Sequence, residues 1–301
     1  MSGPARAPSA VVGIATHNRA AELRKALESA QAQSHRPLRV TVVDDASTDE
    51  TPLLQNDFAS VDWQRWGTGQ GHVRARNHMM LSAGEDYFVS LDDDAWFMQG
   101  DEIAVAVNYL ESHPGVAAVA YDIISPDRPD PVPRGRRRSV PMFIGCGHML
   151  RLSIAKALDG YSEFPGAYGA EEKDLCLRLI DAGYAVHQLD GVHVWHDKSS
   201  TARDLRRQFR SGVCNDLTLA LRRMPLPLLL PVLSWKVTAH LVFAIRHGWL
   251  RPYGEGVQDF LRAGVATWRG RRPVRLHSVS VFRALSKSPR AGSGLNSGGR
   301  R

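Results

Sequence analysis

Three consecutive aspartates follow an apolar run in the stretch YFVSLDDDAWF, residues 87–97. The run has the composition of a buried strand, so Asp92, Asp93 and Asp94 stand directly at its C-terminal end. Ligands of open α/β sheets bind at this end of the strands. Closely spaced carboxylates supply the oxygen ligands that Mg²⁺ or Mn²⁺ prefers, and such an ion binds phosphate oxygens in turn. The triplet is a candidate metal and phosphate site, and a solvated turn is the alternative.

A second acidic pair, Asp44 and Asp45, follows the apolar run at 38–43. Carboxylates in this place can accept hydrogen bonds from a base or a ribose. They also suit the start of a helix, where acids are favoured. Ser47 and Glu50 have the spacing of a capping box, so we expect a helix to begin there.

A third acidic group opens the segment EEKDLCLRLIDAG, which has the pattern of a helix. A carboxylate at a helix start across from the aspartate triplet suits a general base in group transfer. Acids in the first turn are also favoured by the helix dipole, so a purely structural role is the alternative. The candidates are Glu171, Glu172 and Asp174.

A glycine-rich turn, GTGQG, precedes a predicted helix at about 72–83. Its glycines do not have the order of a dinucleotide fingerprint. Gly71 still permits a ligand to approach the backbone closely. Arg76 follows within two helical turns and could pair with a phosphate group bound there. A plain helix start with solvated arginines is the alternative. Beyond a predicted strand at 185–190, His196 is a further candidate ligand for a metal.

Strands alternate with helices over the first two thirds of the chain, which predicts an α/β fold with a mostly parallel sheet flanked by helices. After His196 the pattern becomes helical, and the end of the chain has low-complexity composition. A Pro- and Arg-rich loop at 122–140 is typical of lids and binding loops. The expected units are an α/β domain at 8–200, a helical C-terminal extension at 201–285 and a disordered tail at 286–301.

The apolar run at 225–245 is long enough to span a membrane. It contains Lys236 and His240, and three prolines crowd its start, so a spanning helix is the weaker interpretation. We expect a buried helix of the extension or one lying in a membrane interface, where basic neighbours such as Arg246 and Arg251 suit anionic headgroups.

Composition and charge narrow the function only broadly. The chain has 301 residues, 43% of them hydrophobic, which allows a sizeable core, and a net charge of +7 fits anionic partners. Three cysteines without CxxC spacing argue against a disulfide framework and for a reducing compartment. The short apolar run near the N-terminus is typical of a first strand rather than a signal peptide, and we expect a cytoplasmic protein.

Five segments in this order resemble family 2 glycosyltransferases, which are inverting enzymes with the GT-A fold that use nucleotide-diphosphate sugars. The segments are THNR at 16–19, VVDDASTDET at 42–51, GHVRARN at 71–77, LDDD at 91–94 and YGAEEKDLCLRLIDAGY at 168–184. The resemblance covers residues 10–200 and implies a Rossmann-like nucleotide-binding half and a divalent metal. The amphipathic C-terminal extension suggests a glycan or lipid-linked acceptor.

The resemblance also implies roles for single residues. In the family's pattern the first strand ends against the nucleotide, and the second acid of the first pair accepts from a pyrimidine. The DXD motif binds metal and diphosphate, and the second acid of the ED pair is the general base. Glu172 stands where aspartate is commoner, so Glu171 and Asp174 stay open as alternatives. The implied sets are Thr16, Asn18, Arg19, Asp45, Gly71, Arg76, Asp92 and Asp93 for the nucleotide sugar, and Asp94, Asp92 and His196 for Mg²⁺ or Mn²⁺.

Two other functions compete with glycosyl transfer. A sugar-phosphate nucleotidyltransferase would need a lysine-bearing triphosphate loop near the N-terminus, and GIATHNR at 13–19 is not one. A non-catalytic binder of membranes or nucleic acid would use the basic segment at 134–138, but this leaves the acids at strand ends without a purpose. We therefore expect a UDP-, dTDP- or GDP-sugar donor, no nucleic-acid partner, and a cytoplasmic enzyme that contacts the inner face of the membrane peripherally.

Overall fold

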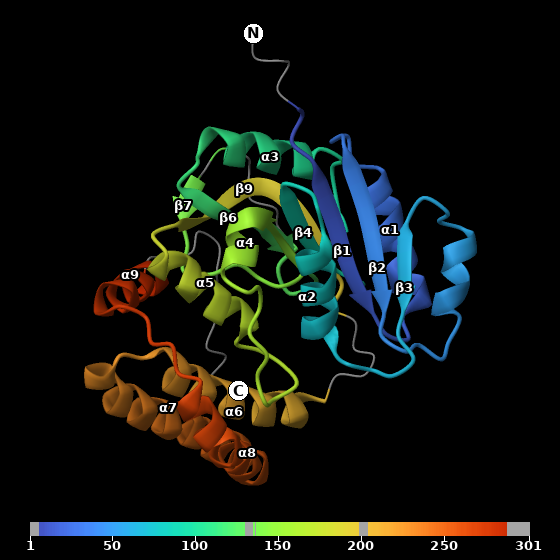
Figure 1. Ribbon diagram of the computed structural model, residues 1–301. Coiled ribbons are helices and arrows are strands. Elements are labelled where there is room, and N and C mark those ends of the chain that lie inside the picture. The colour runs from blue at the N-terminus through green and yellow to red at the C-terminus, as the bar shows by residue number, and fades with distance from the viewer. Residues whose placement is uncertain (1–5, 130–134, 136, 199–203, 288–301) are drawn as a thin grey trace.

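The computed structural model describes residues 6–129, 135, 137–198 and 204–287 and has a central sheet with helices on both faces (Figure 1). The sheet has the order β3-β2-β1-β4-β8-β6-β9-β5, with β7 paired to β9. The strands are β1 (Ala10–Thr16), β2 (Leu38–Asp44), β3 (Asp62–Arg65), β4 (Tyr87–Asp92), β5 (Ala95–Phe97), β6 (Val116–Ile124), β7 (Arg137–Ser139), β8 (Gly147–Arg151) and β9 (Ala185–His196). The helices are α1 (Ala20–Gln31), η1 (Thr51–Asn56), α2 (His72–Ser82), α3 (Glu102–Ser112), α4 (Leu152–Ala157), α5 (Glu171–Asp181), α6 (Leu205–Arg223), α7 (Leu226–His247), α8 (Leu250–Arg269) and α9 (Leu276–Lys287).

The N-terminal half of the sheet is parallel, as the alternating pattern predicts. β1 pairs in parallel with β2 and β4, and β2 pairs in parallel with β3. The other half is mixed, because β8 runs antiparallel to both β4 and β6, and β5 and β7 run antiparallel to β9. Parallel pairing brings the C-terminal ends of β1, β2 and β4 to one edge, and in Figure 1 the arrowheads of β1 and β2 point toward the side on which α6 lies.

Two apolar layers cover the sheet, one on each face. Residues of α1 and α3 join one core with alternate residues of β1, β2 and β4, and residues of α2, α4 and α5 join the other. Strands that are covered on both faces have continuous apolar runs, which is why β1 and β4 are recognisable in the sequence. The two layers hold the strand ends in fixed positions.

The C-terminal extension is helical, as expected. α6 packs against α7 and α8, while α9 packs against α5 of the α/β domain through Leu177, Val274 and Val279. α9 was not expected from the sequence. Residues 288–301 of the predicted tail lie outside the described part of the chain, and residues 286 and 287 form the last turn of α9.

Two local expectations are wrong. The capping box at Ser47 and Glu50 does not start an α-helix, because the Ser47 hydroxyl instead accepts a hydrogen bond from Asn18 N (2.9 Å) and a 3₁₀ helix begins at Thr51. The loop expected at 122–140 is shorter, since β6 continues to Ile124 and residues 137–139 form β7. Residues 130–134 and 136 of this loop lie outside the described residues.

The run at 225–245 forms α7, which is long and apolar enough to cross a membrane. Only Leu229 and Ala244 of its side chains are buried. The expectation of a helix buried within the extension is therefore wrong, and α7 lies on its outer surface.

Candidate active site

The three aspartates lie at the C-terminal end of β4, in a tight turn to the short strand β5. Asp93 and Asp94 are almost fully buried, whereas the Asp92 side chain keeps 29% of its exposure. Three neighbouring carboxylates repel each other, so their burial requires positive partners.

Two arginines supply these partners. Arg19 Nη1 lies 2.8 Å from Asp93 Oδ1 and 3.4 Å from Asp94 Oδ2. Arg76 forms an ion pair with Asp92. Burial raises the pKa of Asp93 to about 6, with Asp94 raising it further and Arg19 opposing the shift. The three carboxylates therefore form a strongly anionic site, in which nearby cations reduce the electrostatic repulsion.

The residues expected to hold a metal do come together. His196 Nε2 at the end of β9 lies 3.2 Å from Asp94 Oδ1. A ligand atom of Asp92, one of His196 and the Cys146 thiol sulfur all lie within 4.8 Å of one another. Carboxylate oxygens and imidazole nitrogen fit Mn²⁺ or Mg²⁺. Sequence reasoning missed Cys146, because nothing near it in the chain has ligand spacing.

The first two acids of α5 lie near the triplet and differ in environment. His72 Nε2 lies 3.1 Å from Glu171 Oε1, and this contact lowers the pKa of Glu171 against the opposing effect of burial. Burial and the neighbouring Glu171 raise the pKa of Glu172 to about 7, although Arg76, 3.4 Å from Glu172 Oε1, works in the other direction. A carboxylate that titrates near neutral pH suits a general base.

Gly145 shows how closely the chain packs around this carboxylate. A Cβ atom at Gly145 would clash with Glu172 Oε1 and would lie 3.1 Å from Arg76 Nη1. A side chain at this position would therefore displace the Glu172 carboxylate and the Arg76 guanidinium. The backbone at Gly145 lies directly next to the candidate base.

Asp174, the other alternative for the base, is occupied elsewhere. Its carboxylate accepts from Arg223 Nε (2.6 Å) and Arg178 Nε (2.7 Å) and from the Ser162 hydroxyl (2.7 Å). Arg223 lowers the pKa of Asp174 against the effect of burial. The side chain thus holds α5 to α6 and is sealed from a substrate.

Asp45 closes the glycine-rich turn. Its two carboxylate oxygens accept from Gln70 N (2.6 Å) and Gly71 N (2.7 Å). Gly71 has φ +91°, a conformation that favours glycine, and starts α2. Each carboxylate oxygen can accept a second hydrogen bond, so Asp45 keeps capacity for a base.

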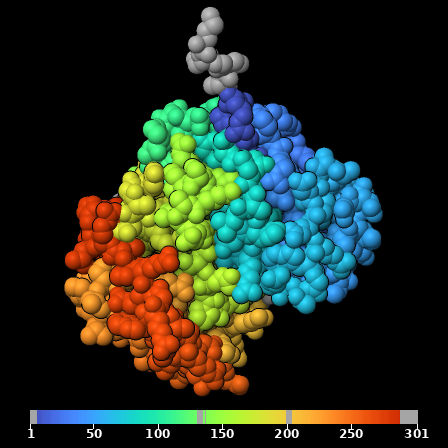
Figure 2. All heavy atoms as spheres, in the orientation of Figure 1, coloured from blue at the N-terminus to red at the C-terminus, as the bar shows by residue number. Residues whose placement is uncertain are grey.

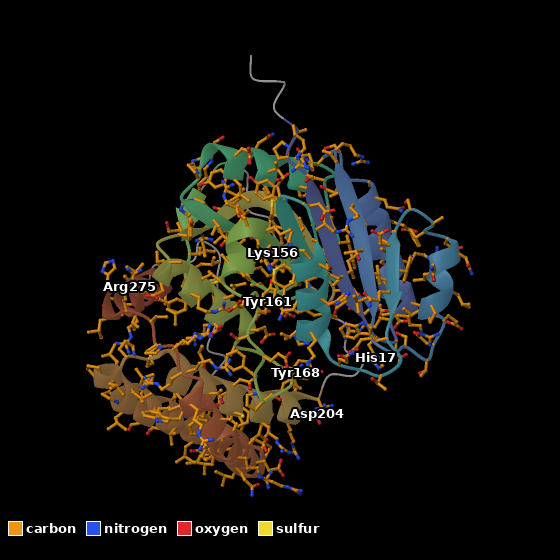
Figure 3. All side chains as sticks on the ribbon, in the orientation of Figure 1. His17, Lys156, Tyr161, Tyr168, Asp204 and Arg275 are labelled. Atoms are coloured by element: carbon orange, nitrogen blue, oxygen red, sulfur yellow. The ribbon has the colours of Figure 1, made fainter. Side chains whose placement is uncertain are left out.

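Thr16 and Asn18 lie at the end of β1, next to the end of β2. The Thr16 hydroxyl is buried and has no hydrogen-bond partner among the described residues. The Asn18 carbonyl oxygen accepts from Thr48 N (2.7 Å), so this side chain ties two loops together. Figure 3 labels the intervening His17, which lies at the same edge of the sheet as Tyr168 of the loop before α5.

The loop before α5 is held by one side chain of the helical extension. Asn215 of α6, 1% exposed, accepts from Gly166 N (2.7 Å) and donates to the carbonyls of Gly166 (3.0 Å), Tyr168 (2.9 Å) and Gly169 (2.8 Å). The next residue, Ala170, has φ +83° and leads directly into Glu171. The extension therefore sets the position at which α5 begins.

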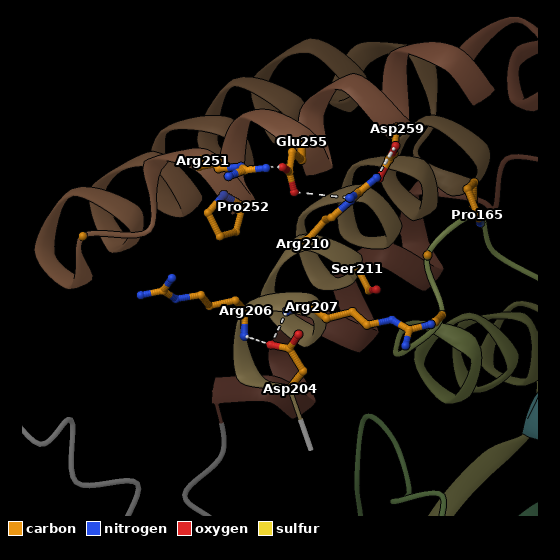
Figure 4. Close-up of a pocket in the computed structure, with 13 residues that line it drawn as sticks. Pro165, Asp204, Arg206, Arg207, Arg210, Ser211, Arg251, Pro252, Glu255 and Asp259 are labelled. Atoms are coloured by element: carbon orange, nitrogen blue, oxygen red, sulfur yellow. Dashed lines mark hydrogen bonds and ion pairs between the residues drawn. The ribbon is translucent and has the colours of Figure 1, made fainter. Parts of the chain in front are cut away.

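A cavity of about 650 Å³ lies beside this loop, between residues 165–167 and helices α6 and α8 (Figure 4). Arg206, Arg207, Arg210 and Arg251 line it. Arg210 is paired with Glu255 and Asp259, whereas the guanidinium groups of Arg206 and Arg207 have no acidic partner within the described residues. Asp204, Glu255 and Asp259 also line the cavity, so its part beside Arg206 and Arg207 is the part that suits an anionic group. The cavity is separate from the aspartate triplet.

The sequence of residues 11–159 matches the family model of glycosyl transferase family 2. The chain belongs to this family. It is 28% identical over 241 residues to the glycosyltransferase EpsE of Bacillus subtilis (strain 168), covering 73% of this chain and 84% of EpsE.

Solved glycosyltransferases share the fold. The mannosyltransferase PcManGT of Pyrobaculum calidifontis, in complex with GDP-Man and Mn²⁺, superposes with a TM-score of 0.60 at 17% identity, covering 94% of this chain and 80% of that one. S. aureus TarS 1-349 with UDP-GlcNAc gives 0.62 at 16% identity, covering 84% and 81%. The predicted family and GT-A fold are confirmed.

In this glycosyltransferase the Asn215→Ala substitution should lower kcat by about ten- to a hundredfold, because α5 and its acids would lose their fixed position. Nucleotide affinity should stay unchanged, since Asn215 does not contact the ends of β1, β2 or β4. Steady-state kinetics and calorimetry of donor binding measure the two effects. Thr218→Val, a buried change on the same helix, serves as the control, and equal losses of kcat and donor affinity in Asn215→Ala would contradict this positioning role.

Proposed function

We propose that the enzyme is a metal-dependent inverting glycosyltransferase with Glu172 as its general base. One observation carries the proposal: Arg76 contacts both Asp92 of the triplet and Glu172 of α5. The candidate diphosphate site and the candidate base thus contact the same guanidinium, which supports the proposal that an acceptor hydroxyl binds between them.

In the proposed reaction a Glu172 carboxylate oxygen takes the proton of the acceptor hydroxyl. The acceptor oxygen forms a bond to the anomeric carbon while the bond to the diphosphate oxygen breaks, and the diphosphate leaves with the electron pair. Attack from the face opposite the leaving group inverts the anomeric configuration. Arg76 and Arg19 are placed to balance the charge on the departing diphosphate.

Asp94, Asp92 and His196 would hold Mg²⁺ or Mn²⁺ in this proposal. The ion would neutralise the negative charge that develops on the leaving group. PcManGT forms its complex with GDP-Man together with Mn²⁺, which is in keeping with a divalent ion in this fold.

The donor would be a nucleotide-diphosphate sugar, with UDP, dTDP and GDP all compatible with the site. Solved neighbours hold GDP-Man and UDP-GlcNAc. We propose that the nucleobase lies against Asp45 and the buried hydroxyl of Thr16, which has no hydrogen-bond partner among the described residues. Asn18, Arg19 and Gly71 border the same place, and Asp93 keeps Arg19 in position.

The acceptor would be a hydroxyl of a glycan, in cell-envelope or other glycan biosynthesis, carried on a lipid. The arginine-lined cavity beside residues 165–167 would then take an anionic part of that acceptor, such as a phosphate. We propose that the enzyme meets this acceptor in the cytoplasm, at the inner face of the membrane.

Calorimetric titration with UDP, dTDP and GDP, with and without Mn²⁺, tests the donor site. Binding of one nucleoside diphosphate that tightens when Mn²⁺ is added is the expected result. If none of the three binds in either condition, the proposed function is wrong.

A further inference from the structure

An apolar stripe runs along the outer side of α8. Its members recur every three or four residues, or at multiples of that spacing, so they lie on one side of the helix. They are Leu250, Val257, Leu261, Val265 and Trp268. All except the half-buried Val257 are exposed, Leu261 and Val265 to 66% each. The opposite side of α8, with Gly256 and Thr267, is buried against the rest of the extension.

Arginines line one edge of this stripe. Arg251, Arg262 and Arg269 each follow a stripe residue by one position, so they lie beside it on the same edge. Arg251 and Arg262 also contact Glu255 (3.0 Å) and Asp259 (3.5 Å), while Arg269 has no acidic partner in the part of the chain that the structure describes. An apolar stripe with cations along its edge is the pattern of a helix that lies in a lipid interface.

Helix α7 adds a second apolar surface and packs against α8. Its exposed large side chains include Leu230 at 74% and Trp235 at 73%. The full set is Leu226, Leu230, Trp235, Val237, Val242, Phe243 and Ile245. Exposed apolar surface of this extent on a soluble domain marks an interaction site. Arg246 near the end of α7 is exposed and unpaired within the described residues, so it adds a positive charge to this surface.

The polar side of α7 contacts α6, so α7 packs along the other helices of the extension. Lys236 Nζ and His240 Nε2 lie 2.7 and 3.3 Å from Asp216 Oδ2 of α6. These two contacts, with Lys173, lower the pKa of Asp216 well below its usual range against the effect of burial. A spanning α7 would carry Lys236 into the hydrocarbon, and it would either bring Asp216 of α6 with it or break their ion pair, both of which are costly. The geometry favours a helix with one polar and one apolar side.

We propose that the outer faces of α7 and α8 lie in the interface of an anionic lipid bilayer, with Trp235 and Trp268 at headgroup level. Aromatic side chains of this kind are enriched at membrane interfaces, and arginines beside the stripe meet the negative headgroups. In Figure 2 the orange-red helices of the extension form the lower edge of the molecule, away from the blue N-terminal strands, so a flat surface can approach them.

Membrane binding by α7 and α8 would serve the proposed glycosyl transfer to a lipid-linked acceptor. Only this biological role of the membrane contact rests on the proposed function. α8 contributes Arg251 and Pro252 to the arginine-lined cavity, and α6 contributes Asn215, which holds the loop before Glu171. A bilayer on the outer face of α8 would therefore bring lipid-linked acceptors next to the cavity. Membrane binding itself needs neither nucleotide nor metal.

Flotation of the full chain with vesicles tests the surface directly. The protein should float with vesicles of phosphatidylcholine and phosphatidylglycerol, and much less with phosphatidylcholine alone. Binding should weaken as salt is raised, because salt screens the charge contribution. Equal recovery with both vesicles, or none with either at low salt, would overturn the proposal.

Matched variants separate the apolar and charged contributions. Arg246→Gln with Arg269→Gln should lower partitioning into anionic vesicles by about thirtyfold, since each basic side chain near such a surface contributes roughly fivefold. Leu261→Ser with Trp268→Ser should lower binding to both vesicle types. The controls are Arg24→Gln and Leu53→Ser, which remove an exposed arginine and an exposed leucine from the α/β domain. If the controls lose as much binding as the variants, the assigned surface is wrong.

Two further measurements exclude other occupants. The fluorescence of Trp235 is identified as the signal that is lost in Trp235→Phe. Lipids brominated near the carbonyl end of the acyl chain should quench this signal, whereas strong quenching by bromine near the methyl end would indicate a spanning α7.

Light scattering without lipid should show a monomer. A dimer that the Leu261→Ser and Trp268→Ser variant disrupts would mean that a second copy covers the surface. Nucleotide binding, measured separately without lipid, reports on the proposed function alone.

Discussion

Glu172→Gln should lower the rate of sugar transfer by about 10²–10⁴-fold, the usual contribution of a general base, while donor affinity stays unchanged. Glutamine keeps the shape of the side chain but cannot take the proton of the acceptor hydroxyl. Rates from product formation and donor affinity from calorimetry separate the two effects. The matched control is Glu163→Gln, which removes an exposed carboxylate paired with Arg74.

The pH dependence tests the same residue in the unaltered enzyme. Because the pKa of Glu172 is raised to about 7, the carboxyl is mostly protonated below that pH and cannot act as a base. We therefore expect kcat/KM to fall about tenfold per pH unit below pH 7 and to reach a plateau above it. A flat profile between pH 5 and 8 would argue against this base.

Stability should change in the opposite direction to activity. The pKa of a glutamate in the unfolded chain is about 4.3, lower than the value of Glu172 in the folded protein. The unfolded state therefore binds fewer protons between these two values, and the native state loses stability as pH rises through this window. Glu172→Gln should remove that loss of stability, so the free energy of unfolding of the variant at pH 8 should exceed that of the parent protein.

The activity of two variants decides between the neighbouring acids. Full activity in Glu172→Gln, together with loss of activity in Glu171→Gln, would assign the general base to Glu171.

Asp94→Asn should weaken donor binding in the presence of Mn²⁺ by at least about tenfold, because even a partner that only orients a metal ligand contributes ten- to a hundredfold to metal affinity. Donor binding without metal should change little, since the substitution removes a negative charge from the proposed metal site and leaves the proposed nucleobase pocket unaltered. Calorimetry at several Mn²⁺ concentrations measures both affinities.

Asp62→Asn is the matched control for this change, because Asp62 is an exposed aspartate at the start of β3, at the other end of that strand from the site. Equal weakening of donor binding with and without Mn²⁺ in Asp94→Asn would show that Asp94 does not hold the ion. It would then serve only as the partner of Arg19 and His196.

Much of the α/β domain is readable from local patterns. Strands that are buried on both faces consist mostly of apolar residues, so β1 and β4 stand out as apolar runs. The acids that end β2 and β4 are equally visible in the sequence. The helix at Glu171 follows from its periodic leucines. The direction of β8 is not readable, because an apolar strand has the same composition in parallel and antiparallel pairs.

The assignment of roles among the acids of α5 depends on partners far away in the chain. Glu171, Glu172 and Asp174 are all carboxylates in the first turn of one helix, so the family pattern favours Glu172 but leaves the other two as alternatives. Arg223, 49 residues beyond Asp174, removes that carboxylate from the choice, and Arg76, 96 residues before Glu172, contacts the proposed base.

Local patterns along the chain identify the family, the parallel half of the sheet and the acids at its edge, because periodicity and strand ends depend on residues that are neighbours in sequence. Contacts between distant segments explain the remaining features. Arginines at the start of α1 and within α2 pair with the aspartates, Asn215 holds the loop before α5, and α7 lies exposed. These features could not be predicted, because local composition does not indicate which distant segments pack together.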